Sequence, residues 1–157
     1  MNEPPIDSVP KKLAATLIVR RRINATPQKL FAAWTQPTFL VRWWGPQGVA
    51  CPAAEIDLRV GGSYRIANQL PDGTVIWIAG IFEVIEPPHR LRYTWKLESQ
   101  SGPAERVTVC FEAHGAATEV IVTHERIPDE ATKMSHERGW TGCLDGLAKY
   151  AEHPGTE

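Results

Sequence analysis

The sequence has no long hydrophobic run, no excess of basic charge and no closely spaced cysteine pair. No segment reaches the roughly 18 apolar residues of a membrane-spanning helix. Seventeen Lys and Arg stand against eighteen Asp and Glu, so the net charge is −1. Nucleic-acid-binding domains carry a strongly basic surface. We therefore expect neither a membrane span nor a nucleic-acid partner.

A secretory signal is also not indicated. Residues 13–19 are apolar and follow two lysines, but three arginines come next and no small-residue cleavage site follows. The three cysteines, at positions 51, 110 and 143, are widely spaced and odd in number, which favours reduced structural thiols. Both observations predict a cytoplasmic protein.

Motifs for catalysis or metal binding are absent as well. The five histidines, at positions 89, 114, 124, 136 and 153, form no i, i+4 pair, and no G-x-S-x-G elbow occurs. The sequence thus predicts no metal site, no cofactor and no identifiable catalytic residue. It leaves enzymatic activity undecided and favours a binding function.

The unusual component is tryptophan. Six Trp occur in 157 residues, beside four Phe and three Tyr. Aromatic side chains offer wide apolar faces, and Trp and Tyr add a polar edge. This composition predicts either an aromatic core or a cavity lined with rings.

The order of elements predicts one α+β domain over residues 13–152, between flexible tails at 1–12 and 153–157. A strand over 14–24 precedes a helix that Thr26 caps and Pro27 begins, and a short helix over 38–43 follows. Alternating residues between 53 and 126 predict six further strands, and a long helix follows Pro128. We expect a curved antiparallel sheet of about seven strands, with the long helix covering its concave face.

Glycines raise two open questions in this scheme. The apolar run 74–85 is either a strand buried on both faces or one bent at Gly80. Gly139, Gly142 and Gly146 interrupt the last helix, and each costs about 1 kcal/mol relative to Ala. They indicate either close approach to another element or space that is left open.

Several separated motifs resemble one family. They are AAWTQPTFLVRWWGP (32–46), EIDLRVGGSYR (55–65), PDG (71–73), IFEVIEPPHRLRYTW (81–95) and a GW pair that opens a Leu-bearing helical segment (139–147). Together they resemble the family similar to the C-terminal domain of the activator of the heat-shock-protein-90 ATPase, within the START-like (SRPBCC, helix-grip) superfamily. The resemblance implies a helix-grip fold with a deep, largely apolar cavity. Relatives in the superfamily bind lipids, sterols or polyketides, or catalyse cyclisation and hydrolysis.

The side chains expected to face such a cavity come from the early helices, the strands and the last helix. Of the adjacent rings Trp43 and Trp44, one should enter the core and the other the cavity mouth, because neighbours on a helix differ by about 100° in direction. His124 follows Val120 and Val122 at period two, so it should point inward, either toward a ligand or as a satisfied core histidine. The candidate ligand-binding residues are Trp43, Trp44, Tyr64, Trp77, Tyr93, Trp95, His124, Met134, Trp140 and Leu144.

Three functions follow as hypotheses. The first is binding of a small, mostly apolar molecule, lipid-, polyketide- or aromatic-like, between the sheet and the C-terminal helix. The second is a cyclase- or hydrolase-type enzyme that uses His124. The third, which the resemblance implies, is a partner of a heat-shock chaperone whose ATPase it stimulates. Homodimer formation stays open.

Overall fold

Within the described residues, 15–46 and 48–152 of the computed structural model, seven antiparallel strands form one curved sheet. Their order in the sheet is β1–β7–β6–β5–β4–β3–β2. The strands are β1 (Ala15–Ile23), β2 (Ala54–Ile56), β3 (Ser63–Gln69), β4 (Val75–Glu86), β5 (Arg90–Leu97), β6 (Glu105–His114) and β7 (Ala117–Ile127). The tails predicted at 1–12 and 153–157 lie outside the described residues, so the domain boundaries stay a prediction.

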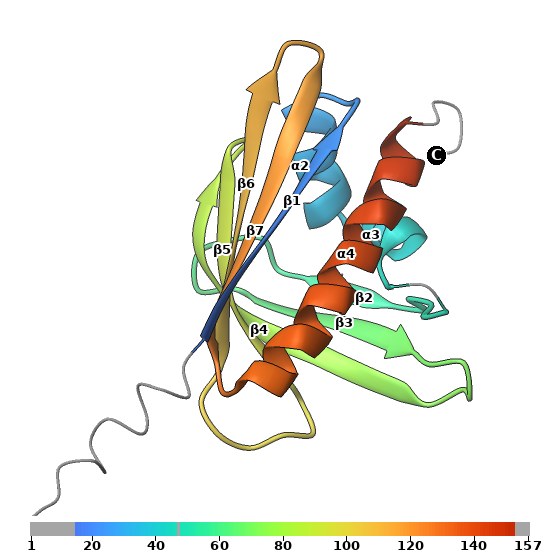
Figure 1. The fold of residues 1–157 in the computed structure, drawn as a ribbon, viewed down its shortest axis with the longest axis vertical. Helices are drawn as coiled ribbons and strands as arrows, with labels where there is room; N and C mark the ends of the chain where they lie inside the picture. Colours follow the sequence, from blue (N-terminus) through green and yellow to red (C-terminus); the bar gives the residue numbers. More distant parts are fainter. Residues whose placement is uncertain (1–14, 47, 153–157) are drawn as a thin grey trace, which may run out of the picture.

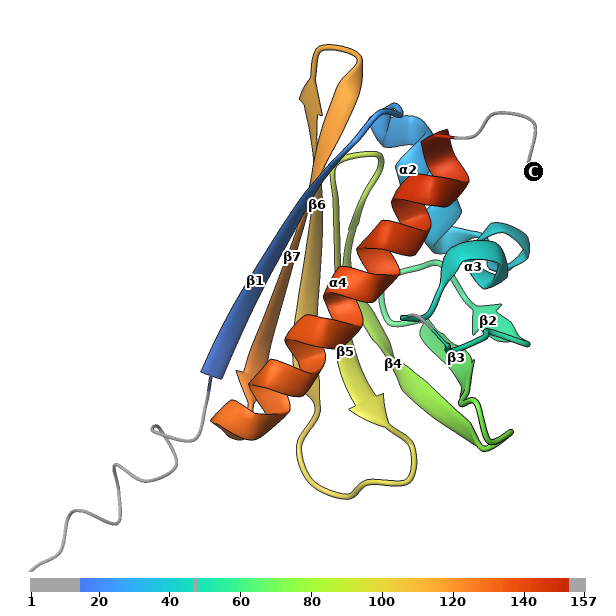
Figure 2. The same ribbon diagram turned by 45° about the vertical axis from the view of Figure 1, so that its right-hand side comes forward.

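Three helices accompany the sheet over the same ranges: α2 (Pro27–Thr35), α3 (Pro37–Trp43) and α4 (Glu130–Glu152). Figure 1 and Figure 2 show the long α4 running across the concave side of the sheet, with α2 and α3 beside its C-terminal half. This is the α+β helix-grip arrangement that the sequence predicts. None of the helices in the described ranges is both long and apolar enough to cross a membrane.

The short helices begin where their local chemistry predicts. The Thr26 side chain accepts a hydrogen bond from the backbone N–H of Lys29 at 3.1 Å, and Pro27 fills the first helical position. α2 then buries Leu30 and Trp34. Helix α3 begins at Pro37, one residue before the predicted start.

Trp34 is the centre of an aromatic core beneath α4. Its ring lies 5.0 Å from Trp43, 6.3 Å from Trp44 and 6.0 Å from Trp140, measured between centroids. Its indole N–H donates to the hydroxyl of Tyr93 at 3.3 Å. Four of the six tryptophans therefore form one packed cluster that joins α2, α3 and α4.

The buried stripe of α4 differs from the predicted one in its first turns. Trp140, Leu144 and Leu147 are buried, but Met134 is 56% exposed. At 3.6 residues per turn, six residues place Met134 about 120° around the helix from Trp140, whereas four residues bring His136 nearly into line with it. His136, not Met134, therefore continues the inner face toward the N-terminus of α4.

The glycines of β4 and α4 differ in how closely other parts of the chain approach them. Strand β4 buries Ile78 and Phe82 while Ile81 is 43% exposed, so it is buried on one face only, and the expectation of two buried faces is wrong. A Cβ at Gly80 would overlap the carbonyl of Thr94, which explains why this position has no side chain. On α4, a Cβ at Gly146 would lie 2.7 Å from the carbonyl oxygen of Trp43, but one at Gly139 would meet no atom of the described residues within 4 Å. Close approach and open space thus both occur on the same helix.

Candidate ligand pocket

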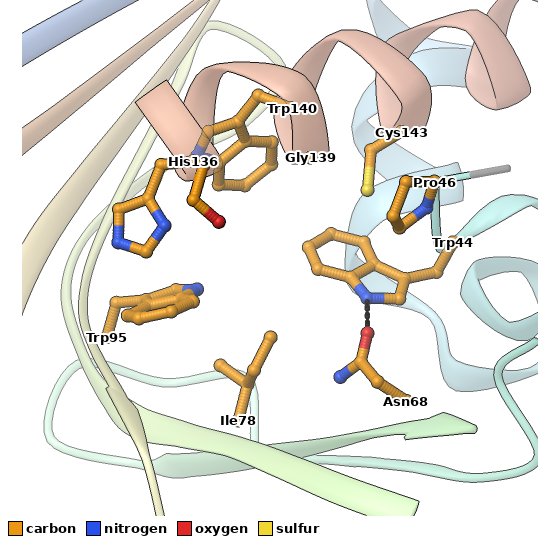
Figure 3. A pocket seen from close by; sticks show the side chains of 10 residues that line it. Trp44, Pro46, Asn68, Ile78, Trp95, His136, Gly139, Trp140 and Cys143 are labelled. Carbon is orange, nitrogen blue, oxygen red and sulfur yellow. Dashed lines mark hydrogen bonds between the residues drawn. The ribbon is translucent and has the colours of Figure 1, made fainter. Parts of the chain in front are cut away.

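A pocket of about 100 Å³ lies between the N-terminal half of α4, strands β3 to β5 and the segment after α3 (Figure 3). Most of its wall is aromatic or aliphatic. The side chain of Ser135 is exposed, so the pocket reaches solvent on that side. The lining residues are Trp44, Pro46, Asn68, Ile78, Trp95, Ser135, His136, Gly139, Trp140 and Cys143.

Trp44 and Asn68 form one end of the pocket. The indole N–H of Trp44 donates to the side-chain oxygen of Asn68 at 3.0 Å, and the Asn68 amide nitrogen donates to two strand carbonyls at 3.2 and 3.3 Å. The neighbouring Trp43 turns into the core, where its N–H donates to the carbonyl of Ala33 at 3.0 Å. The two adjacent rings therefore divide between core and pocket, as predicted, and both amide hydrogens of Asn68 have an acceptor.

The opposite end of the pocket is built on a charged triad. Oε1 of Glu105 lies 2.7 Å from Nε2 of His124 and 2.9 Å from Nε2 of His136. The two imidazoles stack with centroids 4.5 Å apart. The sheet register explains the meeting, because Glu105 pairs with Trp95 and His124 pairs with Val107, two residues further along β6.

Trp140 fixes the protonation pattern of His124. Its indole N–H donates to Nδ1 of His124 at 2.9 Å. Because an indole can only donate, Nδ1 must be the acceptor, and Nε2 must carry the proton that goes to Glu105. His124 is fully buried with both ring nitrogens engaged, which matches the satisfied-core alternative for this residue.

Burial and hydrogen bonding set the charges of the triad. Burial lowers the pKa of His124, although its hydrogen bond to Glu105 opposes the change. Burial would raise the pKa of Glu105, but hydrogen bonds from His124 and His136 outweigh it and lower that pKa to about 2. The triad therefore holds a carboxylate, with a neutral His124 behind it.

Three metal-type donors meet in this triad, although the five histidines are scattered along the sequence. The donor atoms of Glu105, His124 and His136 lie within 4.8 Å of one another. A metal-bound histidine coordinates through a nitrogen lone pair. In His124, Nε2 carries a proton and Nδ1 accepts from Trp140, so coordination would break an existing hydrogen bond. The arrangement fits a hydrogen-bonded triad better than a metal site.

The ten predicted ligand-binding residues separate into groups. Trp44, Trp95 and Trp140 line the pocket. Trp43 and Leu144 are buried in the core outside its lining, and His124 lies behind its wall. Tyr64 and Tyr93 line a separate void of about 10 Å³, the size of one water molecule.

Two of the ten lie away from both spaces. Trp77 is half-buried under the guanidinium of Arg65, which lies 3.9 Å from the ring centroid. It is opposite in strand parity to the pocket residue Ile78, so it belongs to the outer face of the sheet. Met134 is exposed on α4, for the helical reason given above.

Sequence reasoning missed the wall residue His136 and, behind it, Glu105. Glu105 and His136 carry the polar end of the pocket, yet each looks like an ordinary surface residue in the sequence. His136 had one usable signal, its spacing of four residues from Trp140. Glu105 had none, because only the pairing of β5, β6 and β7 brings it to the histidines.

Comparison with known proteins places these features in a family context. Residues 24–152 match the family model described as Activator of Hsp90 ATPase homolog 1-like protein. A search of curated proteins finds no match to the sequence.

Solved structures with a similar fold have been determined from several organisms. Protein CV1439 from Chromobacterium violaceum is 26% identical with a TM-score of 0.79, over 88% of this chain and 97% of that one. The AHSA1 protein SPO3351 from Silicibacter pomeroyi is 28% identical with a TM-score of 0.79, over 88% and 100% of the two chains. CalU16 from Micromonospora echinospora is 25% identical with a TM-score of 0.69, over 88% and 76%. These similarities support the fold class predicted from the sequence.

Proposed function

The chain belongs to the Activator of Hsp90 ATPase homolog 1-like family, and from that premise we propose that it binds one small, flat, mostly apolar molecule between α4 and the sheet. The observation that carries the proposal is the pocket wall. Indole rings of Trp44, Trp95 and Trp140 surround it, from a loop, a strand and a helix. Concave, mostly apolar sites with a few polar groups are typical of small-molecule binding.

The pocket volume discriminates among the ligand classes expected from the sequence. Pockets for drug-sized ligands span roughly 300–1,000 Å³. An apolar cavity of about 150 Å³ holds benzene. The pocket here measures about 100 Å³ and reaches solvent beside Ser135. Because this volume is below that of the benzene cavity, it leaves room for at most one ring, which would extend toward the opening, and an aromatic-like molecule of one ring is favoured over a lipid or a polyketide.

Gly139 provides a direct test. It lines the pocket, and a side chain at this position would enter open space. We expect Gly139→Leu to fill the pocket without displacing any backbone. Met134→Leu is the matched control, since Met134 is exposed on the same helix.

The measurement is a titration with toluene, followed by tryptophan fluorescence and by amide chemical shifts. Wild type and Met134→Leu should show the same saturable change at pocket residues, and Gly139→Leu should show none. No saturable change in wild type would overturn the proposal. So would undiminished binding in a folded Gly139→Leu variant.

A chaperone partner, cytoplasmic location and homodimer formation remain separate proposals. All three cysteines are free thiols, which suits a reducing compartment such as the cytoplasm. The chaperone proposal is tested by adding the protein to its own cell's heat-shock chaperone at saturating concentration. An unchanged ATPase rate would contradict it and would leave the ligand proposal untouched.

A further inference from the structure

Two polar atoms in the pocket have no hydrogen-bond partner among the described residues. The first is the indole N–H of Trp95. This side chain is only 8% exposed, and every other indole N–H of the pocket wall has an acceptor, Asn68 for Trp44 and His124 for Trp140. A buried donor without a partner is costly, by about 1–3 kcal/mol, so such a group is rarely left unsatisfied.

The second is Nδ1 of His136. Its Nε2 faces the carboxylate of Glu105 at 2.9 Å, and a carboxylate can only accept, so Nε2 carries a proton. In the neutral imidazole, Nδ1 is then a lone-pair acceptor. No described residue donates to it.

Both atoms face the same space. Figure 3 shows the indole nitrogen of Trp95 and one ring nitrogen of His136 on the pocket side of their rings. The two rings are in edge contact, with centroids 4.9 Å apart. A donor and an acceptor thus face the pocket from two rings in contact, at the end away from Asn68.

A hydroxyl group satisfies both atoms with one oxygen. Its O–H donates to Nδ1 of His136 while its lone pair accepts from the N–H of Trp95. A methyl group of the same size satisfies neither. The other polar side chains of the lining lie apart from these two atoms, since Asn68 is at the opposite end of the pocket, where it accepts from Trp44, and Ser135 is exposed.

We propose that the pocket selects a hydroxyarene, a flat ring carrying a phenol-type hydroxyl, which Trp95 and His136 hold between them. The ring lies among the indole faces, and the hydroxyl points toward the Glu105 triad. The carboxylate of Glu105 accepts from Nε2 of His136, which leaves Nδ1 of the neutral ring as the acceptor. This inference rests on the proposed function and names the ligand class for the same pocket.

The test compares phenol, toluene and anisole at pH 8. The three probes share one ring, but toluene has no oxygen, and anisole can accept a hydrogen bond but not donate one. We expect phenol to bind at least tenfold more tightly than toluene, with anisole closer to toluene. In addition, the indole ¹H–¹⁵N resonance of Trp95 should shift with phenol and stay nearly unchanged with toluene.

Single substitutions show which side chains give the preference for phenol over toluene. His136→Phe and Trp95→Phe should each bring the phenol-to-toluene ratio close to one, while Met134→Leu should keep the wild-type ratio. The phenol-to-toluene affinity ratio is compared only among variants that unfold cooperatively, because cooperative unfolding shows that they are folded. The shift of the Trp95 indole resonance in the wild-type protein tests the same hydrogen bond without any substitution.

The outcomes separate the two proposals. If none of the three probes binds, the proposed function fails. If phenol and toluene bind equally well, the ring pocket stands and the hydroxyarene inference is overturned. Phenol selectivity that persists in both His136→Phe and Trp95→Phe also overturns it, and anisole binding as tightly as phenol removes the role of His136 as acceptor.

Discussion

The indole N–H of Trp140 points at Nδ1 of His124 from 2.9 Å, inside the wall of the pocket. This bond fixes one tautomer of a histidine that has no exposed surface. The fixed Nε2–H of His124 is directed to Glu105, which in turn accepts from His136. The orientation of His136 in the pocket therefore depends on a tryptophan one helical turn away.

Replacing Trp140 by Phe should destabilise the fold by about 1–3 kcal/mol, because the buried Nδ1 of His124 loses its donor. Urea unfolding measures the change. Trp77→Phe is the control, since that ring lies on the outer face and makes no indole hydrogen bond to the described residues. Equal losses in the two variants would show that ring size, not the hydrogen bond, matters at Trp140. Long-range ¹⁵N–¹H couplings of His124 should also report a changed tautomer only in Trp140→Phe.

Acid should weaken the fold in two ranges. The folded pKa of His124 is lowered from 6.5, so the unfolded state binds more protons and stability falls as the pH drops below about 6.5. The pKa of Glu105 is lowered from 4.5 to about 2, so its contribution is present above pH 4.5 and is lost as the pH falls toward 2. The second contribution is on the order of 3 kcal/mol.

Glu105→Gln isolates the lower of these ranges. The free energy of unfolding of the variant should be below that of wild type at pH 7, and the two should converge as the pH approaches 2. The exposed Glu112→Gln should follow the wild-type curve throughout. A constant gap between Glu105→Gln and wild type across this range would contradict the carboxylate account.

The two glycines of α4 should respond oppositely to alanine. Gly139→Ala places a methyl group in open space and should raise stability by up to about 1 kcal/mol through helix propensity. Gly146→Ala should lower stability, because the new Cβ would lie 2.7 Å from the carbonyl oxygen of Trp43. Thermal unfolding of the pair gives the sign of each effect. A destabilised Gly139→Ala would argue against free space beside that residue.

The thiols of Cys51 and Cys143 should resist modification in the folded protein. Burial raises the pKa of Cys51 to about 11 and that of Cys143 to about 12, so neither forms appreciable thiolate at pH 8. Ellman's reagent should react with them slowly in buffer and rapidly in urea. Peptide mapping identifies which cysteine has reacted. Fast modification of Cys143 under native conditions would contradict its burial.

Much of the fold could be predicted from the sequence because its signals are local. The capping threonine and first-turn proline of α2, the alternating strands and the long final helix all depend on residues near in the chain. The separation of Trp43 and Trp44 was predicted from helical geometry, although α3 ends at Trp43 and Trp44 follows it with an extended backbone. Met134 was misplaced because the helical face was counted through an apolar residue, whereas the actual inner face begins with His136.

The polar end of the pocket could not be predicted in the same way. Glu105 starts β6, His124 lies on β7 and His136 on α4, so their meeting depends on strand register and on how the helix crosses the sheet. Trp77 illustrates the same difficulty for a single ring. Its strand is apolar on both parities, and the burial of Ile78 together with the contact of Arg65 identifies its face as the outer one.

The packing of Trp34 against three other indoles has a photophysical consequence. Rings whose centroids lie 5.0 to 6.3 Å apart exchange excitation energy much faster than they emit. Excitation absorbed by Trp43, deep in the core, can therefore reach Trp44 directly, at 5.5 Å, and Trp140 through Trp34 or Trp44. A quenching molecule seated in the pocket would therefore reduce the fluorescence of Trp34 and Trp43 in addition to that of the three indoles of the pocket wall.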